Sequence, residues 1–290
     1  MNITGKTRIT GIIGWPVAHS LSPPMHNAAF KALGLDFAYV PFPVAPEGLA
    51  AGVAGLAALG VAGFSVTIPH KVAILPLLDR ITPEAELIGA VNTVQVEDGR
   101  LTGYNTDGIG LLSALRSKLG FLPEGRQVLV LGAGGAARSA AASLGLSSAG
   151  RVEVANRSPE AGRALAEAMQ ERLPGTAFAS QPLDRIADRG YLASFDLVVN
   201  TTSVGMAGDG FAGLDLAALK PGACVYDMVY APPVTPFLAQ AEALGVPWAN
   251  GLGMLAAQGE AAFRIWTGVA PPEGCMEQAL AACLPTPGNP

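Results

Sequence analysis

Segments typical of β-strands alternate with segments typical of α-helices along nearly the whole chain, and this alternation limits the possible folds more than any other feature. Short apolar runs predict strands in the first part of the chain over residues 8–13, 36–44, 62–68, 91–96 and 100–104. They predict strands in the second part over residues 127–131, 152–155, 196–200 and 224–228. Helical spacing predicts helices over residues 47–59, 108–119, 136–144 and 159–172. Because two parallel strands can be joined only by a crossover, the alternation predicts an α/β fold with mostly parallel sheets.

Local signals refine the ends of these elements. Ser22 precedes two prolines and is expected to cap a helix that begins there. The residues at 97–99, Glu-Asp-Gly, predict that the strands on either side form a hairpin. The stretch 251–284 is helical in pattern, and we expect it to bury one stripe of side chains: Met254, Ala257, Ala261 and Ile265. We expect the Pro/Gly-rich tail from Pro285 to be disordered.

A glycine-rich turn follows the strand predicted at 127–131. The sequence reads Gly132-x-Gly134-x-x-Ala137, and a helix begins at once. This arrangement is typical of dinucleotide-binding (Rossmann) domains, in which glycines allow a tight turn and close approach of a pyrophosphate, while the helix amino end offers free N–H groups to the anion. A turn that merely joins a strand to a helix is the alternative. The expected lengths of the strand, the helix and the next strand favour a nucleotide site.

The end of the following strand indicates which nucleotide binds. NAD-binding domains usually place Asp or Glu there to bind the ribose 2′-hydroxyl. Here the sequence is Asn156-Arg157-Ser158, without an acid. The Arg157 guanidinium can form paired hydrogen bonds with a 2′-phosphate, with Arg138 and Arg163 as candidate helpers. The pattern therefore favours NADP over NAD.

Chain length and the position of the nucleotide signature predict two domains. A chain of 290 residues suits two cores better than one. We predict a substrate-binding catalytic domain at 1–107, completed by C-terminal helices at 252–290. A Rossmann NADP-binding domain is predicted at 108–251. The fold class expected is thus a two-domain α/β protein.

Charge and cysteine content narrow the classes of partner. Charged residues make up only 14% of the chain and the formal net charge is −5, so the chain lacks the basic footprint of a nucleic-acid-binding protein. We expect a small-molecule partner, no nucleic acid, and a monomer or homodimer. Cys224, Cys275 and Cys283 form no CxxC pair, which favours a reduced chain in the cytoplasm. The three histidines lack the Cys or acid neighbours of a metal site, so no metal is expected.

One uncharged stretch, residues 48–69, is long enough to be considered as a membrane span. Glycines interrupt it, and alanine supplies most of its apolar character. Its larger apolar residues fall on one face of a helix: Leu49, Val53, Leu56 and Leu59. We therefore predict a packed helix followed by a strand, and no membrane segment.

Three polar residues stand out as candidates for a chemical site. Lys71 lies at the end of an apolar strand in a chain with few charges, although a lysine reaching to the surface would look the same. Asp107 could serve only as a favourable charge at the start of a helix. Asn92 could be only a turn residue. Considered alone, each of these three residues can be explained by a structural role without any catalytic function.

Nine sequence motifs, in order along the chain, resemble those of the shikimate dehydrogenase family. In the first domain they are GxPxxHSxSPxxHN (14–27), VTxPxK (66–71), GAVNT (89–93) and GxNTD (103–107). In the second they are GAGGAA (132–137), NR[ST] (156–158), NTTSVGM (200–206) and DMVYxPxxT (227–235). The ninth motif, GxGMLxxQ (251–258), begins at the end of the second domain and continues into the helices that complete the first. The resemblance covers essentially the whole chain.

The resemblance implies an activity and a set of residue roles. The family reduces 3-dehydroshikimate reversibly with NADPH, in the chorismate pathway to the aromatic amino acids. Lys71 would be the catalytic group, with Asp107 beside it. Substrate-binding roles are implied for Ser20, Ser22, Ser65, Thr67, Asn92, Asp107, Tyr230 and Gln258. Cofactor-binding roles are implied for Gly132, Ala133, Gly134, Gly135, Ala136, Asn156, Arg157, Ser158, Met228 and Gly251.

The chemistry of these residues suits that activity. Reduction of a carbonyl requires a proton donor to neutralise the growing alkoxide, and the amine of Lys71 can supply it. We expect Asp107 mainly to orient Lys71 and a substrate hydroxyl. Asn92 can donate and accept a hydrogen bond without adding charge.

Ser65 departs from the family pattern, because many members carry Asn at this position and that Asn usually contacts the substrate. Serine has a shorter reach and one donor. A quinate/shikimate dehydrogenase of broader substrate or cofactor use therefore remains open. A separate alternative, independent of Ser65, is a non-catalytic NADP-binding sensor on the same fold. A sensor would tolerate loss of Lys71 or Asp107, and both are present.

Overall fold

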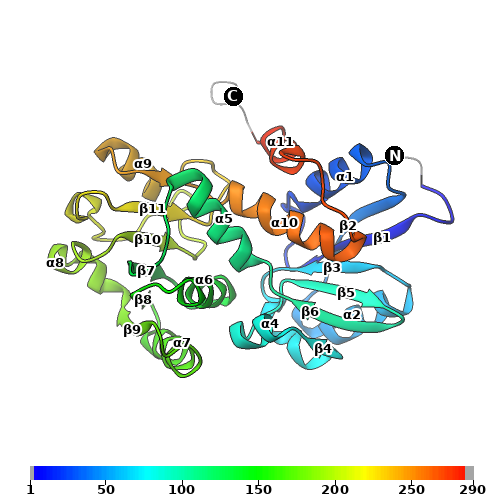
Figure 1. Cartoon of the computed structure of the whole chain (residues 1–290), viewed down its shortest axis with the longest axis horizontal. Coiled ribbons are helices and arrows are strands. Elements are labelled where there is room, and N and C mark those ends of the chain that lie inside the picture. Colours follow the sequence, from blue (N-terminus) through cyan, green and yellow to red (C-terminus); the bar gives the residue numbers. More distant parts are fainter. Residues whose placement is uncertain (1–2, 285–290) are drawn as a thin grey trace. The chain divides into compact units, whose positions relative to one another are not determined.

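The computed structural model of the chain describes residues 3–284, which form two compact units, each built around one six-stranded sheet (Figure 1). The first unit extends to Gly110 and resumes at Leu255, and the second unit comprises Leu111–Met254. The tail from Pro285, expected to be disordered, lies outside the described residues.

The sheet of the first unit has the strand order β2-β1-β3-β5-β6-β4. Its strands are β1 (Arg8–Gly14), β2 (Phe37–Pro43), β3 (Gly63–Val66), β4 (Arg80–Ile81), β5 (Thr93–Glu97) and β6 (Arg100–Tyr104). Pairing is parallel between β1 and both its neighbours and between β6 and β4, and antiparallel between β5 and both its neighbours. The predicted hairpin is confirmed, since β5 and β6 pair across a turn at Asp98 and Gly99, both with positive φ.

Helices cover this sheet. They are α1 (Ser22–Ala32), α2 (Leu49–Ala58), α3 (His70–Ala73), α4 (Pro83–Ile88), α10 (Leu252–Thr267, shared with the second unit) and α11 (Cys275–Ala281), with 3₁₀ turns η1 (Pro46–Gly48) and η2 (Leu75–Leu77). The expected cap of α1 is wrong: Leu21 occupies the N-cap without a side-chain hydrogen bond, and Ser22 is the first helical residue. Ser22 is buried, and its hydroxyl lies near the phenol of Tyr39.

The uncharged stretch forms α2 and β3 as predicted. Leu49, Val53 and Leu56 are buried in the core of the first unit, whereas Leu59 is 81% exposed. Leu59 was wrongly included in the buried stripe because the helix ends at Ala58, so the helical spacing no longer applies. Within residues 3–284, no helix combines the length and apolar character needed to cross a bilayer.

Helix α10 packs against the first sheet through a face that differs from the predicted one. Of the expected stripe, Met254 is buried, but Ala257, Ala261 and Ile265 are only partly buried. The buried side chains are Ala256, Ala262, Phe263 and Trp266. Apolar residues occur on nearly every side of α10, so the pattern alone does not select a face. Trp266 fixes the contact, because its Nε1 donates to the Val94 carbonyl at 3.0 Å.

The sheet of the second unit is entirely parallel, with the order β9-β8-β7-β10-β11-β12. Its strands are β7 (Gln127–Leu131), β8 (Arg151–Asn156), β9 (Ala177–Pro182), β10 (Leu197–Asn200), β11 (Cys224–Asp227) and β12 (Trp248–Ala249). Numbered within the unit, this order is 3-2-1-4-5-6, the order of dinucleotide-binding Rossmann domains. The predicted α/β fold with a Rossmann domain is confirmed.

Helices connect these strands. They are α5 (Asp107–Leu119, shared with the first unit), α6 (Gly135–Leu146), α7 (Pro159–Arg172), α8 (Arg189–Leu192) and α9 (Pro236–Leu244), with 3₁₀ turns η3 (Leu183–Ala187) and η4 (Leu216–Ala218). The strand order reverses between β7 and β10, so the carboxyl ends of these strands mark the place where Rossmann domains bind their ligand.

Candidate active site

Lys71, Asn92 and Asp107 come together at one end of the first sheet. Lys71 lies in α3, shortly after β3 ends, and Asp107 begins α5, shortly after β6 ends. Asn92 directly precedes β5, which runs antiparallel to both of these strands. Antiparallel pairing places the start of β5 beside the ends of β3 and β6, so residues distant in sequence meet at this edge.

The three side chains form one hydrogen-bonded network. Lys71 Nζ donates to Asp107 Oδ2 at 2.5 Å, and Asn92 Nδ2 donates to Asp107 Oδ1 at 2.8 Å. The side chain of Lys71 is 16% exposed and that of Asp107 is 6% exposed. The ammonium is therefore neither in bulk solvent nor sealed in the core, and a small ligand can reach it.

The orientation of Asn92 is fixed by its other contacts. Its Oδ1 accepts from the Thr106 backbone N–H at 2.8 Å and from Thr93 Oγ1 at 3.0 Å. The carbonyl side of the amide is thereby occupied by donors, which directs the NH₂ group toward Asp107. Asn92 is thus more than a turn residue.

Asn105 and Thr106 support the network, although neither was singled out as a site residue. The Asp107 N–H donates to Asn105 Oδ1 at 3.1 Å, and Asn105 Nδ2 donates to the Ala90 carbonyl at 2.9 Å. Asn92 Nδ2 also donates to Thr106 Oγ1 at 2.9 Å. Their presence beside Asp107 in an otherwise apolar segment was the signal for a structural role.

Lys71 was expected at the end of an apolar strand, and this placement is wrong in detail. β3 ends at Val66, and Lys71 is the second residue of the short helix α3. The backbone of Lys71 is anchored there, because its carbonyl accepts from the Val91 N–H at 2.8 Å. Pro69 ends the ladder, since proline has no N–H to donate, and a helical turn carries the lysine to Asp107.

The remaining predicted substrate residues lie in different places. Ser20, Ser22, Ser65, Thr67 and Gln258 belong to the first unit, whereas Tyr230 belongs to the second. Ser22 and Ser65 are linked through a residue the motif analysis did not single out, Tyr39. The amide of Gln258 donates to the Leu255 carbonyl within α10 at 2.8 Å. Burial raises the pKa of Tyr230, so its hydroxyl keeps its proton and can donate.

The glycine-rich turn of the second unit has the geometry that its sequence predicts. Gly132 follows β7 with φ of +112°, and a Cβ there would come within 2.7 Å of Thr201 Oγ1. Thr201 is held in place because its hydroxyl donates to the Leu131 carbonyl at 2.7 Å. Gly132 is therefore required for the turn itself.

Gly134 differs from Gly132, because a Cβ added at Gly134 would meet nothing within 4 Å. Gly134 is the N-cap of α6, and no side chain caps that helix. Open space beside uncapped N–H groups at the amino end of a 12-residue helix fits the close approach of a pyrophosphate. Ala133, Gly135 and Ala136 lie in the same turn and are not fully buried.

The second half of the predicted cofactor site follows β8. Asn156, Arg157 and Ser158 form the link to α7, and Asn156 Nδ2 donates to the Ser158 carbonyl at 2.9 Å. Arg157 is exposed, and it has no carboxylate partner within the described part of the chain. An exposed, uncompensated guanidinium fits a 2′-phosphate. Burial lowers the pKa of Arg138, one of the candidate helpers of Arg157, and the nearby Arg172 lowers it further by a smaller amount.

Met228 and Gly251 lie against each other in the second unit. A Cβ at Gly251 would come within 2.1 Å of the Met228 carbonyl oxygen, so only glycine fits there. The preceding residue, Asp227, is buried and accepts from Asn200 Nδ2, the Val229 N–H and Thr235 Oγ1. Burial raises the pKa of Asp227 despite these donors. Asp227 thereby holds together the loops that follow β10 and β11.

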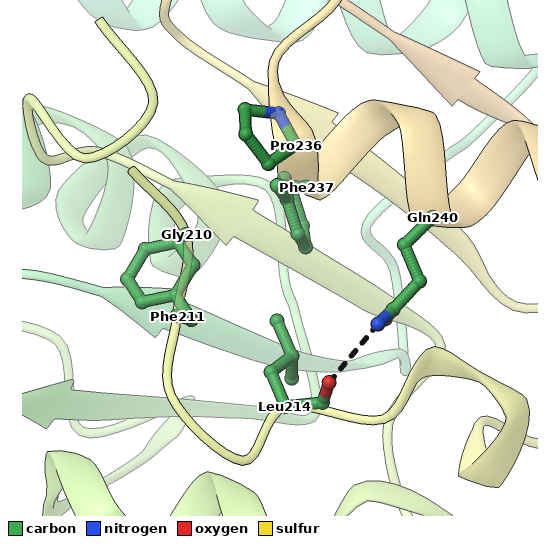
Figure 2. Close-up of a pocket in the computed structure, with 6 residues that line it drawn as sticks. All are labelled: Gly210, Phe211, Leu214, Pro236, Phe237 and Gln240. Carbon is green, nitrogen blue, oxygen red and sulfur yellow. Dashed lines mark hydrogen bonds between the residues drawn. The ribbon is translucent and has the colours of Figure 1, made fainter. Parts of the chain in front are cut away.

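A small pocket in the second unit lies apart from all of these residues (Figure 2). It is lined by Gly210, Phe211, Leu214, Pro236, Phe237 and Gln240. The amide of Gln240 is already used, since it donates to the Leu214 carbonyl and accepts from the Leu216 N–H. None of the predicted substrate or cofactor residues lines this pocket.

Three family models match the chain. Residues 12–94 match the shikimate dehydrogenase substrate binding domain, residues 115–206 match shikimate / quinate 5-dehydrogenase, and residues 251–281 match the shikimate 5'-dehydrogenase C-terminal domain. The NADP(+)-dependent shikimate dehydrogenase of Citrifermentans bemidjiense is 86% identical over 290 residues, covering 100% of both chains. The chain belongs to the shikimate dehydrogenase family.

Solved structures of shikimate dehydrogenases share the fold of this family member. One in complex with NADP+ matches with a TM-score of 0.90 at 40% identity, covering 98% of each chain. The enzyme of Thermus thermophilus, in complex with NADP(H) and shikimate, matches with a TM-score of 0.84 at 39% identity, covering 96% of this chain and 100% of the other. The shikimate dehydrogenase family was the one that the motifs predicted.

Proposed function

We propose that the chain catalyses the reversible, NADP-dependent reduction of 3-dehydroshikimate to shikimate. Membership of the shikimate dehydrogenase family supports this activity, as does the 86% identity to a curated NADP(+)-dependent member. The observation that carries the proposal is the network at the edge of the first sheet, in which Asp107 binds both Lys71 Nζ and Asn92 Nδ2.

The second unit holds the cofactor. The turn from Gly132 to Ala136 and the amino end of α6 bind the pyrophosphate, and Arg157 binds the 2′-phosphate, with Asn156 and Ser158 beside it. Met228 and Gly251 would lie along the cofactor. When bound, NADPH supplies the hydride that the substrate carbonyl carbon receives.

Lys71 moves the proton. In the reduction, its ammonium donates a proton to the carbonyl oxygen as that oxygen gains negative charge, and in the oxidation its amine takes the hydroxyl proton back. Asp107 holds Lys71 Nζ in place and accepts from a substrate hydroxyl. Asn92 Nδ2 also donates to Thr106 Oγ1, and it contacts a substrate hydroxyl by exchanging that hydrogen bond for one to the substrate.

Hydroxyl and amide side chains hold the rest of the substrate. Ser20, Ser22, Ser65, Thr67, Tyr230 and Gln258 supply donors to the carboxylate and to the ring hydroxyls. A small polyhydroxylated acid satisfies such groups, whereas an apolar ligand would leave buried donors unpaired.

The proposed setting is the cytoplasm, with the enzyme as a monomer or homodimer acting on a free small molecule. The three cysteines are unpaired, which agrees with a reducing compartment. Light scattering of the purified protein gives the oligomeric state directly.

Initial rates test the proposal most directly. Oxidation of shikimate and of quinate is measured separately with NADP+ and with NAD+. We expect the highest kcat/KM for shikimate with NADP+. A comparable kcat/KM for quinate would instead identify a quinate/shikimate dehydrogenase, and NADP+ binding without turnover of either acid would identify a sensor.

A further inference from the structure

Tyr39 is a buried tyrosine that connects two of the residues proposed to hold the substrate. It lies in β2 and is only 2% exposed. Its hydroxyl donates to Ser65 Oγ at 2.8 Å, and the Ser22 side chain is a further polar neighbour of the same phenol oxygen. Ser22 and Ser65 come from α1 and β3, so the phenol links elements that are separate in sequence.

Two residues of the motif at 14–27, His26 and Asn27, hold Tyr39 in a fixed position. Asn27 binds its backbone twice, since Asn27 Nδ2 donates to the Tyr39 carbonyl and the Tyr39 N–H donates to Asn27 Oδ1, both at 2.9 Å. The ring of His26 stacks on the Tyr39 ring, with centroids 4.4 Å apart and planes 11° apart. The tilted indole of Trp266 lies 5.8 Å from the Tyr39 ring. The phenol oxygen is therefore fixed within the core.

The direction of the hydrogen bond from Tyr39 to Ser65 determines what Ser65 can do. Burial raises the pKa of Tyr39, so the phenol keeps its proton and acts as a donor. Ser65 Oγ accepts this hydrogen bond, and no other hydrogen bond joins the Ser65 side chain among residues 3–284. The proton of Ser65 itself is left for another acceptor.

Ser65 also lies next to the catalytic network. It is paired in register with Thr93 on β5, the neighbour of Asn92. The N–H of the following residue, Val66, donates to the Asn92 carbonyl at 2.7 Å. A substrate held by Asn92 and Asp107 is therefore within reach of this part of β3.

We propose that Tyr39 is a positioning residue that orients Ser65 as a hydrogen-bond donor to an acceptor oxygen of the substrate. The inference rests on the proposed function, because it assumes a polyhydroxylated acid beside Asn92.

A double-mutant cycle tests this proposal. Tyr39→Phe keeps the ring and its stack on His26 but removes the hydroxyl, and Ser65→Ala removes the donor. We expect each single variant to raise KM for shikimate about tenfold, with kcat and KM for NADP+ little changed, as loss of one hydrogen bond predicts. The double variant is expected to match Ser65→Ala, because Tyr39 acts only through Ser65.

Tyr104→Phe is the matched control. The backbone carbonyl of Tyr104 accepts from the Asn92 N–H at 3.1 Å, but its hydroxyl donates to Gln95 Oε1 at 2.9 Å and not to a proposed substrate residue. Phenylalanine keeps the backbone contact, so loss of the hydroxyl alone should leave all kinetic constants unchanged. Effects of Tyr39→Phe and Ser65→Ala that simply multiply in the double variant would overturn the proposal. So would a Tyr39→Phe variant with lowered melting temperature and lowered kcat but normal KM. If Tyr39→Phe does not fold, Ser65→Cys keeps the side-chain size, weakens both hydrogen bonds and should raise KM in the same way.

The dissociation constant of shikimate, measured by calorimetry on each variant, separates this proposal from the proposed function. A wild-type protein that binds shikimate without oxidising it contradicts the proposed activity. The role of Tyr39 can still be decided in that case, by comparing the shikimate dissociation constants of the two single variants and the double variant. A wild-type protein that does not bind shikimate overturns both.

Discussion

Lys71 and Asp107 form an ion pair in which Nζ lies 2.5 Å from Oδ2, and the other carboxylate oxygen is occupied by Asn92 Nδ2 at 2.8 Å. Asp107 therefore meets a cation on one side and a neutral donor on the other. The pair is partly buried, so the position of the ammonium is set by Asp107 rather than by solvent. This arrangement gives separate expectations for the two residues.

Lys71→Ala should lower kcat by about 10²–10⁴-fold, the usual contribution of a general acid. Affinity for NADPH should be unchanged, because the proposed cofactor contacts lie in the second unit. Steady-state rates and a fluorescence titration with NADPH measure the two quantities. Equal losses of turnover and cofactor affinity would contradict the role given to Lys71.

Asp107→Asn should lower kcat and raise KM for shikimate together, each by about tenfold or more. The amide leaves the Lys71 ammonium without its counter-charge and can turn a donor toward a substrate hydroxyl. Kinetics with shikimate over a range of concentrations separate the two effects. Near-normal constants would reduce Asp107 to a favourable charge at the start of α5.

The elements predicted correctly from the sequence are those whose ends are determined by residues close to them in the chain. The helix at 159–172 and the strand at 127–131 were predicted to the residue, because a proline start and a short apolar run fix their ends. The edge strand β9 was missed, since Ala177–Pro182 has no fully buried position and hence no apolar alternation. Alternation of apolar and polar residues indicates a strand only where one face of that strand is buried.

The candidate site was predicted less completely, because its contacts depend on pairing between distant strands. Lys71, Asn92 and Asp107 stood out as polar residues in apolar surroundings. Tyr39 did not, since an aromatic residue in a strand is ordinary. It reaches Ser65 only because β1 pairs with both β2 and β3, which brings strands distant in sequence together.

His26 should make the stability of the protein depend on pH. It is fully buried among aromatic rings, neither ring nitrogen has a partner among the described residues, and burial lowers its pKa to about 3. The unfolded chain takes up a proton near pH 6.5, whereas the folded protein does not. Stability is therefore fully present above pH 6.5 and is lost as the pH falls toward 3, by about 2 kcal/mol between pH 7 and pH 5.

His26→Phe tests this expectation, because phenylalanine fills the aromatic site without a titratable group. Urea unfolding at pH 7 and pH 5 gives the free energy of unfolding for both proteins. The variant should lose about 2 kcal/mol less than the wild type on acidification. An identical pH dependence in the two proteins would show that another group is responsible.

Arg157→Gln should raise KM for NADP+ by about 10–100-fold and leave KM for NAD+ unchanged, because only NADP+ carries the 2′-phosphate. Arg126→Gln removes the same charge at the opposite end of β7, where Arg126 binds Asp196 at 3.3 Å. That control should not alter the ratio of the two KM values. Equal changes in KM for NADP+ and for NAD+ would mean that Arg157 does not bind the 2′-phosphate.

Gly132 and Gly134 should respond in opposite ways to alanine. At Gly132 the φ of +112° and the contact with Thr201 should cost about 2 kcal/mol or more of unfolding free energy. At Gly134, with φ of −82° and open space, stability without ligand should stay within about 0.5 kcal/mol of the wild type.

The Gly134→Ala variant isolates the role of that open space. If the pyrophosphate approaches the backbone there, a methyl group should weaken NADPH binding about tenfold or more in a protein that is otherwise intact. The rise in melting temperature that NADPH produces should then shrink, while the melting temperature without ligand stays the same. Calorimetric titration with NADPH gives the affinity independently of stability. Undiminished binding by Gly134→Ala would place the phosphates elsewhere, and Gly132 would then be explained by the turn alone.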